Sequence, residues 1–315
     1  MNTFSKTLVS LAVLSGLTHA AVACDSCALY LAEGAEAPGF TLSVAHQYAR
    51  MGTLWNGSAE TGNPIDQYVD SHTTQVGVAY STGGPWHLQL SVPYVDRAFF
   101  RPDHSRTERG RDQGLGDIIL AGRHRVLKTT TRHGDEWAVH VLGGMKFGTG
   151  NADRLKPANH VHHHFVPSGV HEHDLALGSG STDWLIGADA SWVRARWFAR
   201  AQIQHELRRP GAFGYRFGDE TSWELGAGRY LFLTREKTLS WQALFSGDRR
   251  GLDSLGGIPD DDTGVNVRYV GGRVAGTFGS RFSADASVEL PVRIRTTETM
   301  VVPDYRIRAA LNWRF

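Results

Sequence analysis

Histidine is concentrated in one segment of the sequence, between residues 160 and 173. Neutral imidazole is available at pH 7, and imidazole nitrogens combined with carboxylates suit Zn²⁺, Cu²⁺ or Ni²⁺. The segment therefore predicts a divalent metal site; the alternative is a solvated loop that chelates metal as any histidine-rich tract does. No catalytic metal centre follows, because a mobile loop does not fix three ligands and a water. The candidate ligands are His160, His162, His163, His164, His171, His173, Glu172 and Asp174.

Cys24 and Cys27 form a C-x-x-C pattern and are the only cysteines of the chain. Such a pair can be a redox couple, half of a metal site or a small disulfide. Attachment of haem would need histidine at position 28, which is alanine. A disulfide and metal binding both stay open for this pair.

The other residue types point away from catalysis and from nucleic acid. The chain has no G-x-S-x-G motif, and no pair of acids can be placed as general acid and base. Its 33 Lys and Arg balance 32 Asp and Glu, so it lacks the basic excess of nucleic-acid-binding proteins. We predict a protein that is not an enzyme. The 36 Gly and 9 Trp among 315 residues instead indicate an all-β chain with many turns.

Three long segments alternate between apolar and polar residues, as half-buried strands do. In 304–315 every odd position from Tyr305 to Phe315 is apolar, and every even position except Ala310 is polar. Segments 281–295 and 196–208 repeat the pattern. Alternation alone does not distinguish a soluble sandwich, whose polar face is wet, from a membrane barrel, whose apolar face meets lipid.

Connection lengths and tryptophan positions favour the barrel. Short and long connections alternate along the chain, as in outer-membrane barrels with short periplasmic turns and long external loops. Trp86, Trp137, Trp197 and Trp241 each follow a short turn, where an aromatic girdle is expected. We predict an all-β protein, a transmembrane antiparallel β-barrel of about 12 strands with both termini in the periplasm. The expected strands are 39–50, 70–80, 85–98, 115–127, 135–148, 182–194, 196–208, 220–233, 238–248, 263–275, 281–294 and 304–315.

The first residues have the features of an export signal. Lys6 precedes an apolar core at 8–17, and Ala21-Val22-Ala23 fits a cleavage site. We expect a signal peptide at 1–23, a periplasmic leader with the C-x-x-C pair at 24–38 and the barrel at 39–315. Cys24 directly after the cleavage site leaves lipidation open, although Ala21 stands where lipoprotein signals usually carry leucine.

The last strand ends on Phe315, which resembles the closing-strand pattern that bacterial barrel-assembly machinery recognises. We therefore expect the outer membrane of a Gram-negative bacterium, with the lipid bilayer and that machinery as partners and no nucleic acid. In this strand Leu311 should face lipid and Asn312 the lumen. The predicted lumen-lining residues are Arg123, Arg125, Glu136, His140, Lys146, Arg200, Glu206, Arg268, Asp285, Glu289, Arg306 and Arg308.

Three motifs carry a resemblance to a known family: GLGD at 114–117, KFGTG at 146–150 and GSGSTD at 178–183. They resemble the outer-membrane transporter family named for phenol meta-pathway degradation (MetA-type β-barrel proteins). Gly148 departs from the family pattern, which usually has proline before the threonine. The resemblance implies an outer-membrane channel or transporter for small solutes, and the histidine segment suggests a link to metal ions. The alternative function is a closed barrel that binds metal at the cell surface without transport.

Overall fold

The structure, a computed structural model, describes residues 38–103, 106–157 and 168–315. The predicted signal peptide, both cysteines and four of the candidate histidines (His160, His162, His163 and His164) lie outside the described residues. Among the residues that are described, no helix is long and apolar enough to cross a membrane.

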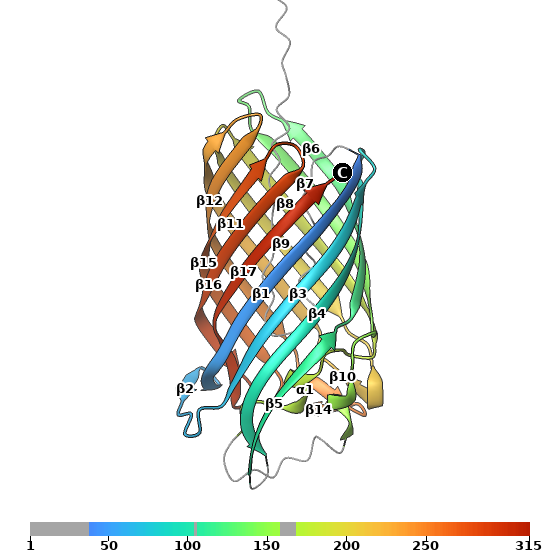
Figure 1. Ribbon diagram of the computed structural model, residues 1–315, viewed down its shortest axis with the longest axis vertical. Helices are drawn as coiled ribbons and strands as arrows, with labels where there is room; N and C mark the ends of the chain where they lie inside the picture. The colour runs from blue at the N-terminus through green and yellow to red at the C-terminus, as the bar shows by residue number, and fades with distance from the viewer. Residues whose placement is uncertain (1–37, 104–105, 158–167) are drawn as a thin grey trace, which may run out of the picture.

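Twelve antiparallel strands form a closed barrel, which confirms the predicted fold class (Figure 1). Each strand pairs with its neighbour along the chain, and the last strand pairs with the first to close the wall. The wall strands are β1 (Gly39–Asn56), β3 (Tyr68–Ser81), β4 (Trp86–Asp103), β6 (Ile118–Thr130), β7 (Glu136–Phe147), β8 (Thr182–Arg194), β9 (Trp197–Leu207), β11 (Glu220–Leu233), β12 (Lys237–Arg250), β15 (Val265–Phe278), β16 (Phe282–Thr296) and β17 (Met300–Arg314).

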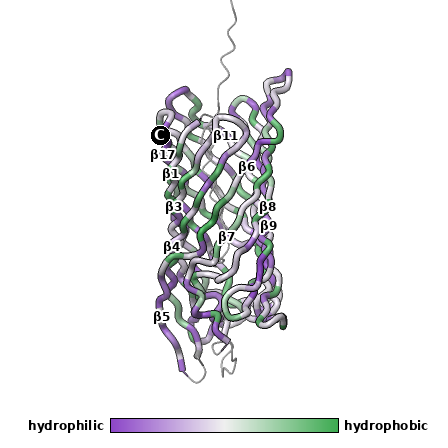
Figure 2. The backbone as a smooth tube through the Cα atoms, turned by 90° about the vertical axis from the view of Figure 1, so that its right-hand side faces the viewer, coloured by the Kyte–Doolittle hydropathy of each residue, from purple (hydrophilic) through white to green (hydrophobic). Residues whose placement is uncertain are grey.

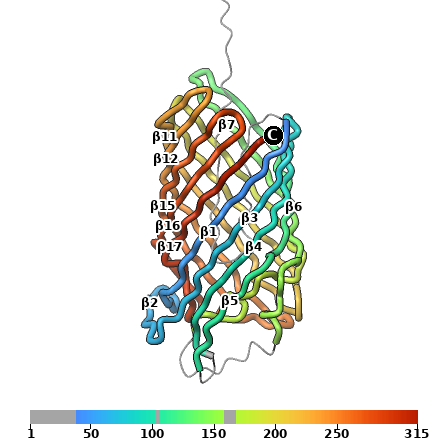
Figure 3. Tube along the Cα trace, in the orientation of Figure 1, coloured from blue at the N-terminus to red at the C-terminus, as the bar shows by residue number. Residues whose placement is uncertain are grey.

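The two ends of the barrel differ in their connections. The short turns lie at the end where β1 begins and β17 finishes, which we call the short-turn end (Figure 3). The longer connections gather at the opposite, long-loop end. Because outer-membrane barrels have short periplasmic turns and longer external loops, the long-loop end corresponds to the external side.

The wall alternates as a membrane barrel does, with apolar side chains outward and polar ones inward. Figure 2 shows hydrophobic and hydrophilic residues interspersed along the strands. Leu311 on β17 is 52% exposed on the outer face, whereas Arg306 and Arg308 on the same strand are buried. The order of apolar and polar faces is inverted relative to a soluble sandwich, because the surrounding solvent of the wall is lipid.

Part of the connection between the predicted strands 85–98 and 115–127 is a projecting hairpin. β4 continues to Asp103 and pairs with β5 (Arg106–Leu115), so the two strands extend beyond the wall at the long-loop end (Figure 1). Phe99 lies against Gly110 of β5, where any larger residue would collide with the ring. This close approach fixes the hairpin to the barrel rim.

Other long connections fold into the mouth of the barrel. They carry the 3-10 helix η1 (Asp153–Leu155), the short helix α1 (Glu172–Leu175), the 3-10 helix η3 (Ala212–Gly214) and a small sheet. That sheet consists of β10 (Tyr215–Arg216), β13 (Asp253–Leu255) and β14 (Ile258–Asp260), while β2 (Ala59–Thr61) extends β1. Val170 and Leu175 are fully buried against Leu54, Phe99 and Val301 of the wall. The interior at this end is therefore a packed apolar core rather than open water.

Candidate functional site

The described parts of residues 149–181 form a plug, which we call the mouth segment, and Asp117 holds its two ends together. One carboxylate oxygen of Asp117 accepts a hydrogen bond from the Gly150 N–H at 2.9 Å. The other oxygen accepts the N–H of Ser179 at 2.9 Å and its hydroxyl at 2.6 Å. The Gly150 and Gly178 backbones touch, and a Cβ on either would collide with the other. The three family-like motifs thus meet at the base of the mouth segment.

Two arginine side chains hold the mouth segment in place deeper inside the barrel. Arg97 of β4 is 2% exposed and donates to the carbonyl oxygens of Asp174 and Ala176, the latter at 2.8 Å. Arg250 of β12 donates to the carbonyl oxygen of Thr263 at 3.1 Å and lies 4.0 Å from the Asp174 carboxylate. These contacts tie the helix α1 to opposite sides of the wall.

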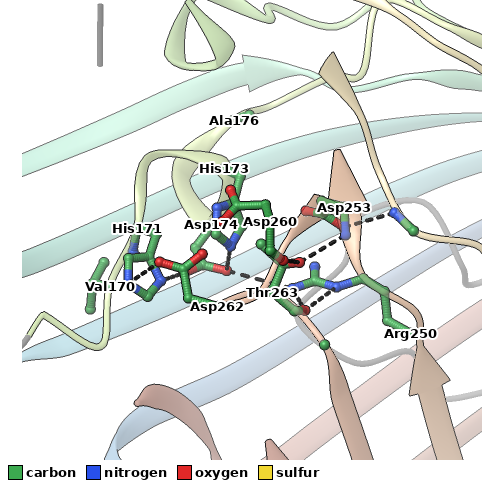
Figure 4. Close-up of polar contacts among 12 residues, drawn as sticks. Val170, His171, His173, Asp174, Ala176, Arg250, Asp253, Asp260, Asp262 and Thr263 are labelled. Atoms are coloured by element: carbon green, nitrogen blue, oxygen red, sulfur yellow. Dashed lines mark hydrogen bonds and ion pairs between the residues drawn. The ribbon is translucent and has the colours of Figure 1, made fainter. Parts of the chain in front are cut away.

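His171, His173 and Asp174 form a compact group inside the mouth (Figure 4). One potential ligand atom of each lies within 4.8 Å of the others, and the two imidazole rings stack at 5.3 Å. A second carboxylate approaches from the connection between β14 and β15, where Asp262 Oδ2 lies 3.5 Å from His171 Nε2. Two imidazoles and two carboxylates are a donor set that suits Zn²⁺, Cu²⁺ or Ni²⁺.

The bonding of His173 fits a ligand role. Its side chain is 1% exposed, and neither ring nitrogen makes a hydrogen bond to the described residues, although Nε2 lies 3.3 Å from Asp174 Oδ1. A buried polar group without a hydrogen bond is costly, and a metal ion would satisfy it. Burial acts to raise the pKa of Asp174, but His173, His171 and Arg250 outweigh it and hold that pKa below its ordinary value. Asp174 is therefore an anion throughout the neutral range.

Glu172 is not part of this group, which corrects its prediction as a neighbouring ligand. Its carboxylate pairs with Arg101 of β4 and with Arg154, at 3.0 Å from the latter. The reason is electrostatic, since two guanidinium groups, those of Arg101 and Arg154, already engage this carboxylate. The predicted cluster of six histidines is thus represented among the described residues by His171 and His173.

A pocket of about 530 Å³, including space open to solvent, lies between the mouth segment and the wall. Its apolar side is made by Met51, Val69 and Met300 and their neighbours on β1, β3 and β17. Its polar side contains Asp174, Glu220, Asp248 and Arg250, so one of the metal-ligand candidates, Asp174, borders the pocket directly. Such a pocket can accept a small molecule with an apolar body and a polar group.

Deeper in the barrel, a buried ion-pair chain crosses neighbouring strands. Lys146 of β7 contacts Glu206 of β9 and lies 2.9 Å from Asp183 of β8. Glu206 in turn lies 3.2 Å from Arg208, which binds Glu220 of β11 at 2.6 Å. All five side chains are at most 2% exposed.

Similar pairs continue around the interior. Arg273 binds Glu224 through both guanidinium nitrogens at 2.8 and 3.0 Å. Arg306 contacts Asp248 at 3.1 Å and Glu289 at 3.3 Å, and it stacks on the ring of Tyr269. A second pocket of about 500 Å³, again including open space, lies on the short-turn side and is lined by residues such as Arg200, Asp285 and Asn312. The ion pairs thus separate two pockets within one lumen.

Most predicted lumen residues lie on the inward side of their strands. On β6 and β8, Arg123 and Asp189 pair across β7 at 2.8 Å, and His140 of β7 contacts the same carboxylate at 3.0 Å. The remaining inward residues are Arg125, Glu136, Lys146, Arg200, Glu206, Asp285, Glu289, Arg306 and Arg308.

Arg268 is the exception, and its prediction was wrong. On β15 the inward positions are Val267 and Tyr269, both fully buried with Ile294 and Val302, while Arg268 is exposed on the outer face. The mouth inverts the usual pattern, because folded loops fill the interior there and the wall rises past the apolar band. Polarity alone therefore misplaces a residue near this rim.

Sequence reasoning missed several residues that build the site. Asp117 and Ser179 belong to two of the family-like motifs, but their joint role depends on a contact between residues 62 positions apart. Asp262, Arg97 and Arg250 carry no local pattern that points to the histidines. A spacing argument cannot find them, because only closure of the barrel brings them together.

No protein-family model and no curated protein sequence matches the chain. Among solved structures, an outer-membrane channel from Pseudomonas putida F1 is similar with a TM-score of 0.64 and 12% identity, over 89% of this chain and 96% of that one. The β domain of the Bordetella autotransporter BrkA gives a TM-score of 0.48 at 12% identity, over 88% and 100% of the two chains. The NanC porin gives 0.44 at 7% identity, over 87% and 100%.

At these identities the first likeness shows the fold and not the substrate. It agrees with the closed barrel and with the outward apolar face described above. The protein is an outer-membrane β-barrel of the Gram-negative type.

Proposed function

We propose that the protein is an outer-membrane channel for small solutes whose external mouth binds a borderline divalent cation. The observation that carries this proposal is the group of His171, His173 and Asp174 in the mouth, of which Asp174 lines the pocket beside the wall. A cation bound there would stand beside the route of any solute that enters from the long-loop end.

The pocket supports a class of solute. Its Met and Val side chains would contact an apolar body, and Arg250 with the carboxylates of Glu220 and Asp248 would contact polar groups. The similar structure from Pseudomonas putida is described as an outer-membrane channel. The motif resemblance to the phenol meta-pathway transporters also supports a small amphipathic molecule as the solute.

The second candidate function is a closed barrel that binds metal without transport. The buried ion pairs favour it, since Lys146, Arg273 and Arg306 bring unlike charges together across the interior. Twelve strands leave only a narrow lumen, which such pairs can occlude. Conductance separates the two candidates.

We expect refolded protein to conduct ions in a planar bilayer, and Zn²⁺ on the long-loop side to lower the current. A bound cation would link the mouth segment to Asp262 and rigidify it next to the pocket. The His171→Ala/His173→Ala variant should conduct like wild type but should not respond to Zn²⁺. A wild-type barrel that is correctly folded and passes no current would refute transport and leave the closed-barrel candidate.

We expect calorimetry to detect a Zn²⁺ or Cu²⁺ site that requires His171 and His173. Removing a ligand should weaken binding by at least about 100-fold, above the ~10–100-fold cost of losing a residue that only orients a ligand. Binding should weaken as the pH falls, because protonated imidazole cannot ligate. The low pKa of Asp174 keeps its carboxylate charged in the neutral range, so the histidines set the pH dependence.

Two control variants sharpen this measurement. His133→Ala removes an exposed histidine from a short turn at the opposite end and should leave binding unchanged. A variant with His160, His162, His163 and His164 all changed to alanine tests the rest of the histidine segment. If this variant loses the tight site while His171→Ala/His173→Ala retains it, the ligands are not those proposed.

A further inference from the structure

Four arginines cluster on the outer wall of the barrel near the long-loop end. Arg249 of β12, Arg268 of β15, and Arg293 and Arg295 of β16 are all exposed. We call them the outer-wall arginines. Their strands are neighbours, and Arg268 is the direct cross-strand partner of Arg293. Directly paired residues have Cβ atoms about 4.5–5.5 Å apart, and diagonal ones about 7–8 Å, so the guanidinium groups share one patch.

The patch begins where the lipid-facing surface ends. On β15 the outward residues from Phe278 to Val270 are apolar or glycine, and Arg268 is the next outward position. On β16 the outward residues from Phe282 to Val292 are apolar, and Arg293 follows. A strand of about 9–11 residues spans a membrane, so these runs match the hydrocarbon thickness. The arginines therefore lie at the level of the outer-leaflet head groups.

The other positions in the two cross-strand rows of the patch are neutral. One row across the strands contains Thr221, Arg249, Asn266 and Arg295, and the next contains Trp223, Gly247, Arg268 and Arg293. None of the outer-wall arginines has an ion pair or side-chain hydrogen bond within the described ranges of the chain. Like charges placed directly opposite destabilise a sheet, and a bound anion would remove that cost.

The wall next to the arginines also offers an aromatic surface. The Trp223 ring lies over Gly247, where a Cβ would come within 2.7 Å of it, and it packs edge-on against Phe245 at 5.0 Å. Trp223 is thus in the same row as Arg268 and Arg293. An aromatic ring beside cations suits a ligand with both apolar and anionic parts.

We propose that the outer-wall arginines bind the phosphate groups of lipopolysaccharide, the phosphorylated glycolipid of the outer leaflet. Guanidinium groups bind phosphate through paired, charge-assisted hydrogen bonds, and basic clusters at a membrane surface attract anionic head groups. The acyl chains of the lipid would lie on the apolar run below, against Val270 and Leu290, which are 43% and 53% exposed. The site is independent of the solute route, since it lies on the outside of the wall.

The test compares two double variants of the refolded protein in detergent. Arg268→Ser/Arg293→Ser removes two central charges of the patch. Arg235→Ser/Arg281→Ser removes two exposed charges from short turns at the opposite end and serves as the matched control. Native mass spectrometry and thermophoresis would measure binding of bis-phosphorylated lipid A, its dephosphorylated form, and phosphatidylglycerol. Heat-modifiable migration on gels verifies that each variant is folded.

We expect Arg268→Ser/Arg293→Ser to weaken binding of bis-phosphorylated lipid A by about ten-fold or more, since charged hydrogen bonds are the strong ones. The control should bind like wild type, and dephosphorylated lipid A should bind weakly to all three proteins. Equal binding of lipid A by the variant and wild type would overturn the proposal. Equal competition by phosphatidylglycerol would overturn it as well, because the patch would then be a general anionic-lipid surface.

Discussion

Replacing Lys146 with methionine is expected to destabilise the folded barrel by about 3 kcal/mol. Methionine retains the apolar stem of the side chain but removes the charge between Asp183 and Glu206, which are 0% and 1% exposed. Breaking a buried ion pair by removing one partner costs roughly 3–5 kcal/mol, because a buried charge remains without compensation. The lower value applies, since Arg208 still contacts Glu206, and the Ser181 hydroxyl and the Arg209 backbone N–H still donate to Asp183.

Unfolding by urea in detergent, followed by tryptophan fluorescence, measures this effect. Lys237→Met is the matched control: Lys237 is exposed at the first residue of β12, and its loss should change stability by about 0.5 kcal/mol or less. A rescue variant, Lys146→Met with Asp183→Asn and Glu206→Gln, should recover much of the lost stability, because it also removes the buried carboxylate charges that Lys146 compensates. If Lys146→Met and Lys237→Met unfold alike, the ion-pair chain does not stabilise the barrel.

Leu311→Arg should impair folding into lipid far more than Asn312→Arg, although the two positions are adjacent. Leu311 is 52% exposed on the outer face, whereas Asn312 points inward, where it donates to the Ser283 hydroxyl at 3.2 Å and lines a pocket. A cation on the lipid face costs roughly 2–4 kcal/mol at the midplane and less toward the rims. Because Leu311 lies inside the apolar band, we expect a loss of about 2 kcal/mol or more.

Folding into lipid vesicles, scored by the shift in gel migration without heating, checks this second prediction. Trp313→Arg provides a depth control, because Trp313 is the next outward residue toward the short-turn rim and should tolerate a cation better than Leu311. Equal yields for Leu311→Arg and Asn312→Arg would mean that the inward and outward faces of β17 are wrongly assigned.

The strands of the wall could be predicted from the sequence because apolar and polar residues alternate within each strand. The predicted segments 182–194 and 220–233 coincide with β8 and β11, where inward acids such as Asp183 and Glu224 alternate with outward apolar residues. Lipid on one side and buried charge on the other impose that alternation along the membrane-spanning part of the wall. The same reasoning placed Arg123 and Lys146 inward, where they lie.

The mouth could not be predicted in the same way. Its residues face neither lipid nor a wet lumen, so Val267 and Tyr269 turn inward and Arg268 turns outward. The helix α1 and the small sheet of β10, β13 and β14 are too short to leave a periodic pattern. The partnership of His171 with Asp262 depends on two loops that are distant along the chain. Such contacts follow from the closed shape of the wall rather than from local sequence.

The pairing of β1 with β17 has a consequence for biogenesis. This ladder joins Thr41 to Arg314 and Trp55 to Met300, so the first and last strands must meet before the wall is complete. Every other neighbour along the wall is a hairpin partner and can pair as soon as it has been exported. Until the final strand arrives, two strand edges stay unpaired, and unpaired edges can pair with other chains and cause aggregation. The growing sheet therefore needs a chaperone or assembly factor that covers these edges during export. A chain that ends before β17 would remain an open sheet and would have to be degraded.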